Sequence, residues 1–253
     1  MRSFAAAMGF LTRVPSGVHA TGGVPPAASV PWFPVVGALV GGAVAGVYAA
    51  GTEVFPPLVA GLLGIGAGVL LTGALHEDGL ADSADAFGGS HDRDSTLRIL
   101  RDPRVGTYGA VAIALSVLTR GAGVASLQAW DALAALVAAH ALSRAAAVGV
   151  LGAIEPAADD GLGATYGRLV GPVRAVAGVG IGVGIGVVAL GLAGLGAAAL
   201  AGISAGWVAS ISRRRIGGVT GDVLGAIQQL AETLILLFAT ALAWRGWDLA
   251  WWR

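Results

Sequence analysis

The sequence contains no cysteine, and all of its fifteen basic residues are arginine. The absence of thiols excludes disulfides, thiolate metal sites and a cysteine nucleophile. Charge is also scarce, because only 12% of the residues are charged, against about 25% in soluble domains. The formal net charge is zero, so the composition gives no indication of a nucleic-acid partner.

The chain is instead rich in apolar residues and glycine. Hydrophobic residues make up 56% of the 253 positions, and the mean hydropathy is +0.79. There are 42 glycines, and small residues allow transmembrane helices to approach closely. We therefore expect an all-α protein, a polytopic bundle of helices embedded in a lipid bilayer and forming one domain over residues 1–253.

Seven segments are apolar and long enough to cross a bilayer, which takes about 20 residues in a helix. They are residues 32–50, 57–75, 107–125, 132–154, 173–192, 195–211 and 223–243. Only the short break at 191–196 separates the fifth from the sixth. A single kinked passage there would leave six spans.

The arginines indicate the orientation, because loops retained in the cytoplasm carry an excess of positive charge. Arginines occur in residues 1–31 and in the second, fourth and sixth connections, whereas the other connections contain none. Seven spans would then place the lead-in 1–31 and every long polar loop in the cytoplasm. The expected location is the cytoplasmic (inner) membrane, with the C-terminus outside.

The second connection, residues 76–106, is the most acidic part of the chain and is expected to be a cytoplasmic loop. Six of the fifteen acidic residues fall between positions 77 and 94. If the segment is helical, Asp78, Asp82 and Asp85 share one face, where their mutual repulsion favours a bound cation. Hard oxygen ligands indicate Mg²⁺ or Mn²⁺. Glu77 is a further candidate ligand, although it points off that face. A solvated acidic loop would show the same spacing.

Residues on both sides of these acids add chemistry that suits a phosphate ligand. His76 stands where the second predicted span ends, either as a general base or as a structural residue. Arg101 and Arg104 flank Asp102, and arginine binds phosphate oxygens through two parallel hydrogen bonds. The same arginines would also serve as cytoplasmic anchors for the spans.

Two charges lie deep within predicted spans, where a charge usually pairs or lines a polar cavity. Arg144 is in the fourth span, and Glu232 is in the seventh, so each is the obvious partner of the other. Thr220 and Asp222 lie where the seventh helix begins. They are candidates for substrate binding or for capping the helix.

These motifs together resemble the cobalamin synthase family, the adenosylcobinamide-GDP ribazoletransferases. The resemblance covers nearly the whole chain and is carried by segments in a fixed order. They read FLTRVP at 10–15, FPVVG at 33–37, HEDGLADSAD at 76–85, RDPRVGTYG at 101–109, GLG at 161–163 and GGVTGDVLGA at 217–226. Arg101 stands where the family pattern has lysine, and Ser83 where it has threonine. Residues 157–160 lack an expected basic residue.

The resemblance implies a late step of cobalamin assembly at the membrane. A ribose hydroxyl of α-ribazole, or of its 5′-phosphate, would attack the phosphorus of adenosylcobinamide-GDP nearest cobinamide and release GMP, with Mg²⁺ as cofactor. On this interpretation Asp78, Asp82 and Asp85 hold Mg²⁺, and Arg101, Arg104 or Arg144 neutralise phosphate oxygens. His76 or a carboxylate, Asp82 and Asp85 included, accepts the proton. The oligomeric state stays open, a homo-oligomer included.

Two other classes of protein explain part of the pattern. A CDP-alcohol phosphotransferase also uses a carboxylate cluster at a membrane face, but its pattern has Ala-Arg where this chain has Ala81-Asp82. A corrinoid or cation transporter would place its acidic residues near the bilayer midplane, with a path to the far side. Here the acids cluster in one connection, which favours an enzyme.

Overall fold

The molecule is a bundle of helices, as the composition predicts. The computed structural model describes residues 1–15, 25–157 and 162–253, with side chains from 165 onward in the last range. Two short 3₁₀ turns, η1 (Pro26–Ala28) and η2 (Val30–Trp32), lead into the bundle. The α-helices are α1 (Arg2–Leu11), α2 (Phe33–Thr52), α3 (Pro57–Thr72), α4 (Leu75–Gly89), α5 (Arg93–Ile99), α6 (Thr107–Ala125), α7 (Ala129–Ala153), α8 (Leu162–Leu190), α9 (Ala193–Ile216) and α10 (Gly221–Trp244).

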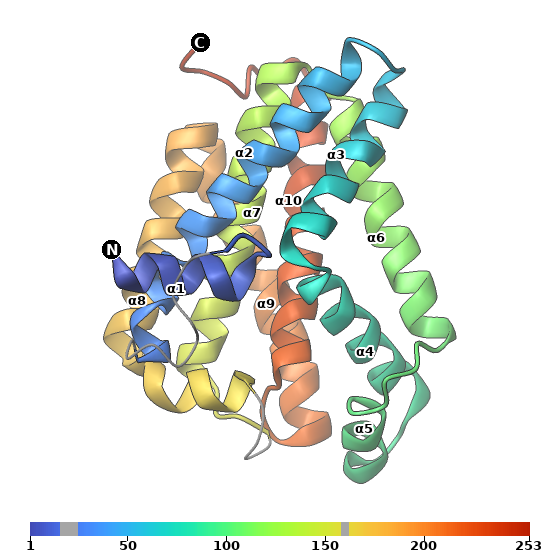
Figure 1. Ribbon diagram of the computed structural model, residues 1–253, viewed down its shortest axis with the longest axis vertical. Helices are drawn as coiled ribbons and strands as arrows, with labels where there is room; N and C mark the ends of the chain where they lie inside the picture. The colour runs from blue at the N-terminus through green and yellow to red at the C-terminus, as the bar shows by residue number, and fades with distance from the viewer. Residues whose placement is uncertain (16–24, 158–161) are drawn as a thin grey trace.

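The long helices run up and down along the longest axis of the molecule (Figure 1). In the described part of the chain, six helical segments are long and apolar enough to cross a membrane. Helices α3 and α4 pass the same test only as a pair, which gives up to seven. In the structure the choice between six and seven spans therefore depends on this bent pair, and not on the break at 191–196 as predicted.

The break between the fifth and sixth predicted spans is real. Helix α8 ends at Leu190, Gly191 adopts a left-handed conformation with φ of 60°, and α9 begins at Ala193. Two separate antiparallel helices follow, instead of one kinked passage. The kink lies earlier, at Gly171, whose φ of 63° and ψ of 158° interrupt α8 just before Pro172.

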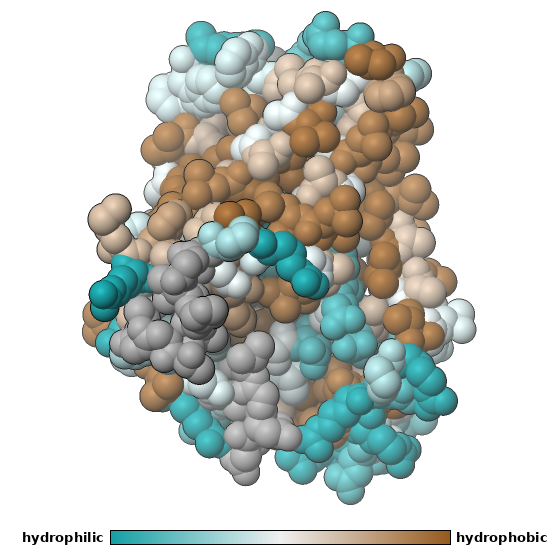
Figure 2. Space-filling view, in the orientation of Figure 1, coloured by the Kyte–Doolittle hydropathy of each residue, from teal (hydrophilic) through white to brown (hydrophobic). Residues whose placement is uncertain are grey.

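Residues 76–106 differ from the expected loop, because most of them are helical. Helix α3 stops at Gly73 and Ala74, which both have positive φ, and the chain turns by 93° into α4. The predicted span 57–75 is therefore wrong at its end: α3 stops at Thr72, because two consecutive left-handed residues end one helix and start another. Helix α4 then carries the acidic cluster as a regular helix, and Figure 2 shows hydrophilic residues gathered over α4 and α5.

The N-terminal segment holds this turn in place. Helix α1 lies across the bundle instead of along it (Figure 1), which fits the expectation of a lead-in outside the spans. The Arg13 backbone N–H donates to the Leu71 carbonyl at 2.8 Å, so it satisfies one of the free carbonyls at the end of α3. The Arg13 side chain packs so closely on Gly73 that a β-carbon there would lie 2.1 Å from its Nε. Part of the predicted lead-in, residues 16–24, lies outside the described residues.

Candidate active site

The site is built where α4 packs directly on α10, backbone against backbone. A β-carbon on Gly79 would lie 2.7 Å from the Asp222 carbonyl oxygen and 3.1 Å from the Gly225 α-carbon. On α10, a β-carbon on Gly225 would lie 3.2 Å from the Gly79 α-carbon. Only glycine allows this approach. The two sequence motifs, 76–85 and 217–226, thus meet at their central glycines.

This contact brings the acidic residues of two helices to one surface. Asp78 is exposed, whereas Asp82 on α4 and Asp222 on α10 are partly buried. The negative charges of Asp78, Asp222 and Asp85 all act on the Asp82 carboxylate. The sequence placed Asp222 with the substrate-binding residues, and the structure places it beside the aspartates of α4.

The donor set suits a divalent cation that is completed by substrate. Among residues 1–15, 25–157 and 162–253, no three metal-ligating side chains converge closely enough to hold an ion by themselves. Mg²⁺ is commonly bound by only one or two carboxylates together with substrate phosphates and water. Asp78, Asp82 and Asp222 offer hard oxygen atoms of that kind, so these residues fit Mg²⁺ with a diphosphate present.

The Asp85 carboxylate accepts hydrogen bonds from the N-terminus of α6. Its Oδ2 accepts the Gly106 N–H at 2.7 Å, and its Oδ1 accepts the Gly109 N–H at 2.9 Å. The carboxylate therefore satisfies two free N–H groups of the helix N-terminus and sits at its positive end. The anion at this helix N-terminus is therefore the side chain of Asp85.

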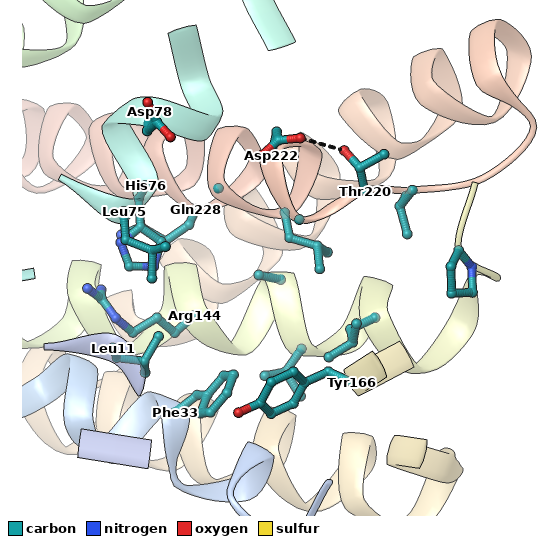
Figure 3. Close-up of a pocket in the computed structure, with 18 of the residues that line it drawn as sticks. Leu11, Phe33, Leu75, His76, Asp78, Arg144, Tyr166, Thr220, Asp222 and Gln228 are labelled. Carbon is teal, nitrogen blue, oxygen red and sulfur yellow. Dashed lines mark hydrogen bonds between the residues drawn. The ribbon is translucent and has the colours of Figure 1, made fainter. Parts of the chain in front are cut away.

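A cavity of about 420 Å³ opens beside the acidic surface. Its walls include six of the residues predicted from the sequence, which come from α4, α7, the start of α10 and the segment after α5. These are His76, Asp78, Arg101, Arg144, Thr220 and Asp222. The volume lies within the range of about 300–1,000 Å³ that is usual for small-molecule sites. Figure 3 shows His76 and Gln228 on one wall, Arg144 between the walls, and Phe33 and Tyr166 on the other.

The N-terminus of α10 also faces this cavity. Thr220 caps the helix, because its Oγ1 accepts the Val223 N–H at 3.3 Å. The same hydroxyl donates to Asp222 Oδ2 at 3.3 Å (Figure 3). Thr220, Gly221 and Asp222 all line the cavity, so the positive end of a 24-residue helix is turned toward it. The predicted cap is confirmed, whereas substrate binding by Thr220 stays a prediction.

Of the two predicted phosphate-binding arginines that follow α5, only one lies at the cavity. Arg101 lines the cavity. Arg104 is exposed and forms an ion pair with Asp102, with Nη2 and Oδ2 2.6 Å apart. Hydrogen bonds from Arg104 hold the pKa of Asp102 at about 2, so this carboxylate is charged at any working pH. The Asp102–Arg104 pair is not part of the cavity wall.

Behind the cavity lies a buried network of charges from four helices. Arg120 on α6 is only 3% exposed and binds two carboxylates. Its Nη1 lies 2.7 Å from Glu232 Oε1 on α10. Its Nη2 lies 3.2 Å from Glu77 Oε1 on α4. Gln229 donates to the same Glu77 oxygen at 2.9 Å. Glu77 thus points away from the aspartates, toward the bundle interior. It joins α4 to α6 and α10.

The predicted pairing of Arg144 with Glu232 is confirmed. Arg144 Nη1 lies 3.6 Å from Glu232 Oε2, and His140 Nδ1 lies 3.1 Å from the same oxygen. The Arg144 Nη1 group also donates to the His140 carbonyl at 2.9 Å. Glu232 is fully buried, so it holds the guanidinium group of Arg144 in a fixed place at the cavity wall. Its role is to position Arg144, and it does not itself line the cavity.

Sequence reasoning missed Arg120, which lies closer to Glu232 than Arg144 does. The signal was present: a single arginine near the end of an apolar span is rare and usually needs a buried partner. It also missed the aromatic wall of the cavity, formed by Phe10, Phe33 and Tyr166. Tyr166 is more than 100 residues from the other two rings along the chain, and no local pattern indicates that they meet.

Comparison with known proteins places the chain among enzymes of one kind. The profile of a family described as cobalamin-5-phosphate synthase matches residues 3–240, almost the entire length. The chain belongs to this family. The resemblance carried by the motifs at 76–85, 101–109 and 217–226 is therefore confirmed. No solved structure gives a significant match to this chain.

Relatives of the family are similar to this chain over nearly their full length. A protein of Bradyrhizobium diazoefficiens named adenosylcobinamide-GDP ribazoletransferase is 40% identical over 242 residues, covering 93% of this chain and 92% of the relative. Proteins of the same name from Ralstonia nicotianae and Azorhizobium caulinodans are 39% and 41% identical, over 96% and 92% of this chain and 95% and 92% of each relative.

Proposed function

We propose that this protein is an adenosylcobinamide-GDP ribazoletransferase. A hydroxyl of the ribose of α-ribazole, or of its 5′-phosphate, forms a bond to the phosphorus nearest cobinamide. The bond from that phosphorus to the GMP oxygen breaks, and the hydroxyl loses its proton. The observation that carries this proposal is the cavity, which joins carboxylates, the buried guanidinium group of Arg144, the exposed one of Arg101 and a helix N-terminus beside one another.

Each part of the cavity has a role in such a transfer, which depends on positioning and on neutralising phosphate charge. Asp78, Asp82 and Asp222 would hold Mg²⁺, which when bound neutralises diphosphate oxygens. Arg144 and Arg101 would bind the remaining oxygens, with the α10 N-terminus supporting them. His76, buried at the cavity wall, is placed to accept the proton of the hydroxyl.

The proposed location is the cytoplasmic membrane, with α4, α5 and the cavity on the cytoplasmic side. The Arg213–Arg215 run ends α9, and Arg93, Arg98 and Arg101 lie around α5, at the same end of the bundle (Figure 1). This charge distribution follows the rule for loops retained in the cytoplasm. The C-terminus lies at the opposite end of the molecule.

A substrate comparison tests the function. The purified full-length protein in liposomes is given adenosylcobinamide-GDP with α-ribazole, or a CDP-linked lipid with an alcohol acceptor, each with Mg²⁺. We expect GMP release and a cobalamin product from the first pair alone. Turnover of the lipid pair alone would overturn the proposal. So would accumulation of corrinoid inside the liposomes without any release of GMP.

A further inference from the structure

We infer that the aromatic wall of the cavity, formed by Phe10, Phe33 and Tyr166, binds the flat apolar base of the acceptor nucleoside. This inference rests on the proposed function and adds to it. It assigns one substrate, the benzimidazole nucleoside α-ribazole, to one wall of the site. The guanine of the nucleotide-linked donor would then lie elsewhere.

Three rings from three separate elements form this wall. Phe10 belongs to α1, Phe33 to the first turn of α2, and Tyr166 to the first part of α8, before its kink at Gly171. The Phe10 ring centroid lies 5.5 Å from that of Phe33 and 4.8 Å from that of Tyr166. All three side chains line the cavity, and Phe10 and Tyr166 are only partly buried, so ring surface remains open to a ligand. A wall of this kind suits stacking or edge contact with another planar ring.

The polarity of the wall favours an apolar base over guanine. Guanine carries hydrogen-bond donors and acceptors along its edge, and burying them without partners is costly. Leu11, Val148 and Leu151 line the cavity and belong to the same hydrophobic cluster as the rings, and they offer no polar side-chain atoms. The hydroxyl of Tyr166 is already engaged with Ser29. A dimethylbenzimidazole base needs few such partners, so it fits this wall better.

The arrangement also orients the acceptor for reaction. Figure 3 shows Phe33 and Tyr166 facing Arg144, with His76 and Asp222 on the far side of the cavity. A nucleoside whose base lies against the rings would extend its ribose across the cavity toward these polar groups. The base would thus fix the position of the hydroxyl group near the proposed phosphate and proton-accepting residues.

Substitution of the ring at position 166 tests the assignment. Tyr166→Leu keeps an apolar side chain and removes the ring, Tyr166→Phe keeps the ring, and Trp207→Leu changes an exposed aromatic residue on α9, outside the cavity. Because stacking contributes about 1–3 kcal/mol per base, we expect Tyr166→Leu to raise the KM for α-ribazole about tenfold or more. The KM for adenosylcobinamide-GDP should stay unchanged. Tyr166→Phe and Trp207→Leu should keep both KM values near those of the wild type.

Equilibrium dialysis with radiolabelled α-ribazole or GMP gives a second readout that does not require turnover. Tyr166→Leu should weaken the binding of α-ribazole and leave the binding of GMP as in the wild type. An unchanged KM for α-ribazole in Tyr166→Leu, or a selective loss of GMP binding, would overturn the inference. Failure of the proposed function looks different, because the wild-type protein would then release no GMP from adenosylcobinamide-GDP.

Discussion

At the scale of single residues, the buried charges are balanced against one another. Arg120 and Arg144 carry two positive charges, and Glu77 and Glu232 carry two negative charges, all within one network. Each of these side chains is at most 8% exposed. Removing one member leaves a buried charge without its partner, which is far more costly than the net stabilisation that an intact pair provides.

Arg120→Gln tests this balance. The variant leaves Glu232 and Glu77 short of a cation, so we expect the protein to lose about 3–5 kcal/mol of stability. The midpoint of thermal unfolding in detergent should fall by roughly 10 °C. Arg245→Gln, at an exposed position beyond α10, is the matched control and should leave the midpoint unchanged. Equal midpoints for both variants would contradict the view that Arg120 joins α4, α6 and α10.

The sequence predicted best the contact that the high cost of an unpaired buried charge requires. A deep arginine and a deep glutamate predicted the Arg144–Glu232 pair, and the structure confirms it. The third partner, Arg120, could not be assigned from spacing, since its position depends on how α6 packs against α10. Glu77 illustrates the same limit: its neighbour Asp78 is exposed, whereas Glu77 is buried, because adjacent helical residues face different directions.

At the scale of helices, the decisive contact is that of α4 with α10. The predicted loop 76–106 could not reveal it, because a one-dimensional hydropathy pattern contains no information on the 93° turn at Gly73 and Ala74. Gly79 and Gly225 belong to the sequence motifs, but only the structure shows why glycine is needed there, because the two helix backbones touch at these positions. Length and apolarity predicted the other spans, whereas the second, 57–75, passes only together with α4.

Gly79→Ala tests this contact. The added β-carbon would lie 2.7 Å from the Asp222 carbonyl oxygen, so α4 and α10 must move apart. We expect a loss of about 1–3 kcal/mol of stability and a fall in kcat of at least tenfold, because Asp78 and Asp82 shift relative to Asp222. Gly42→Ala in α2 is the control, since nothing lies within 4 Å of its added β-carbon. Wild-type kcat in Gly79→Ala would show that the close approach is dispensable.

At the scale of the whole molecule, the polar chemistry is concentrated at one end. Helices α4 and α5 and the start of α10 lie at the end opposite to the C-terminus (Figure 1). Aromatic residues mark that far end: Trp130 and Trp252 pack edge to face with centroids 5.8 Å apart. Tryptophan is enriched where a protein meets the surface of a bilayer. The proposed reactive groups and this tryptophan pair therefore lie at opposite ends of the bundle.

Reporter fusions test the orientation of the bundle. If the bent α3–α4 pair crosses the membrane once, the chain crosses seven times and its two ends lie on opposite sides. We expect a reporter at the N-terminus to be active only in the cytoplasm, and a reporter after Arg253 to be active only outside. Insertion of the same reporters at Asp94 should give the cytoplasmic result. A cytoplasmic signal from the C-terminal fusion would reduce the crossings to six.

The most direct test of the central claim is the Mg²⁺ dependence of GMP release. The rate is measured against Mg²⁺ concentration for the wild-type protein, for Asp82→Asn and Asp222→Asn, and for Asp94→Asn, an exposed acid of α5. We predict that the first two variants need at least tenfold more Mg²⁺ for half-maximal rate, or lose activity altogether, while Asp94→Asn matches the wild type. If Asp82→Asn and Asp222→Asn keep both the wild-type rate and the wild-type Mg²⁺ requirement, the acidic surface of α4 and α10 does not bind the metal.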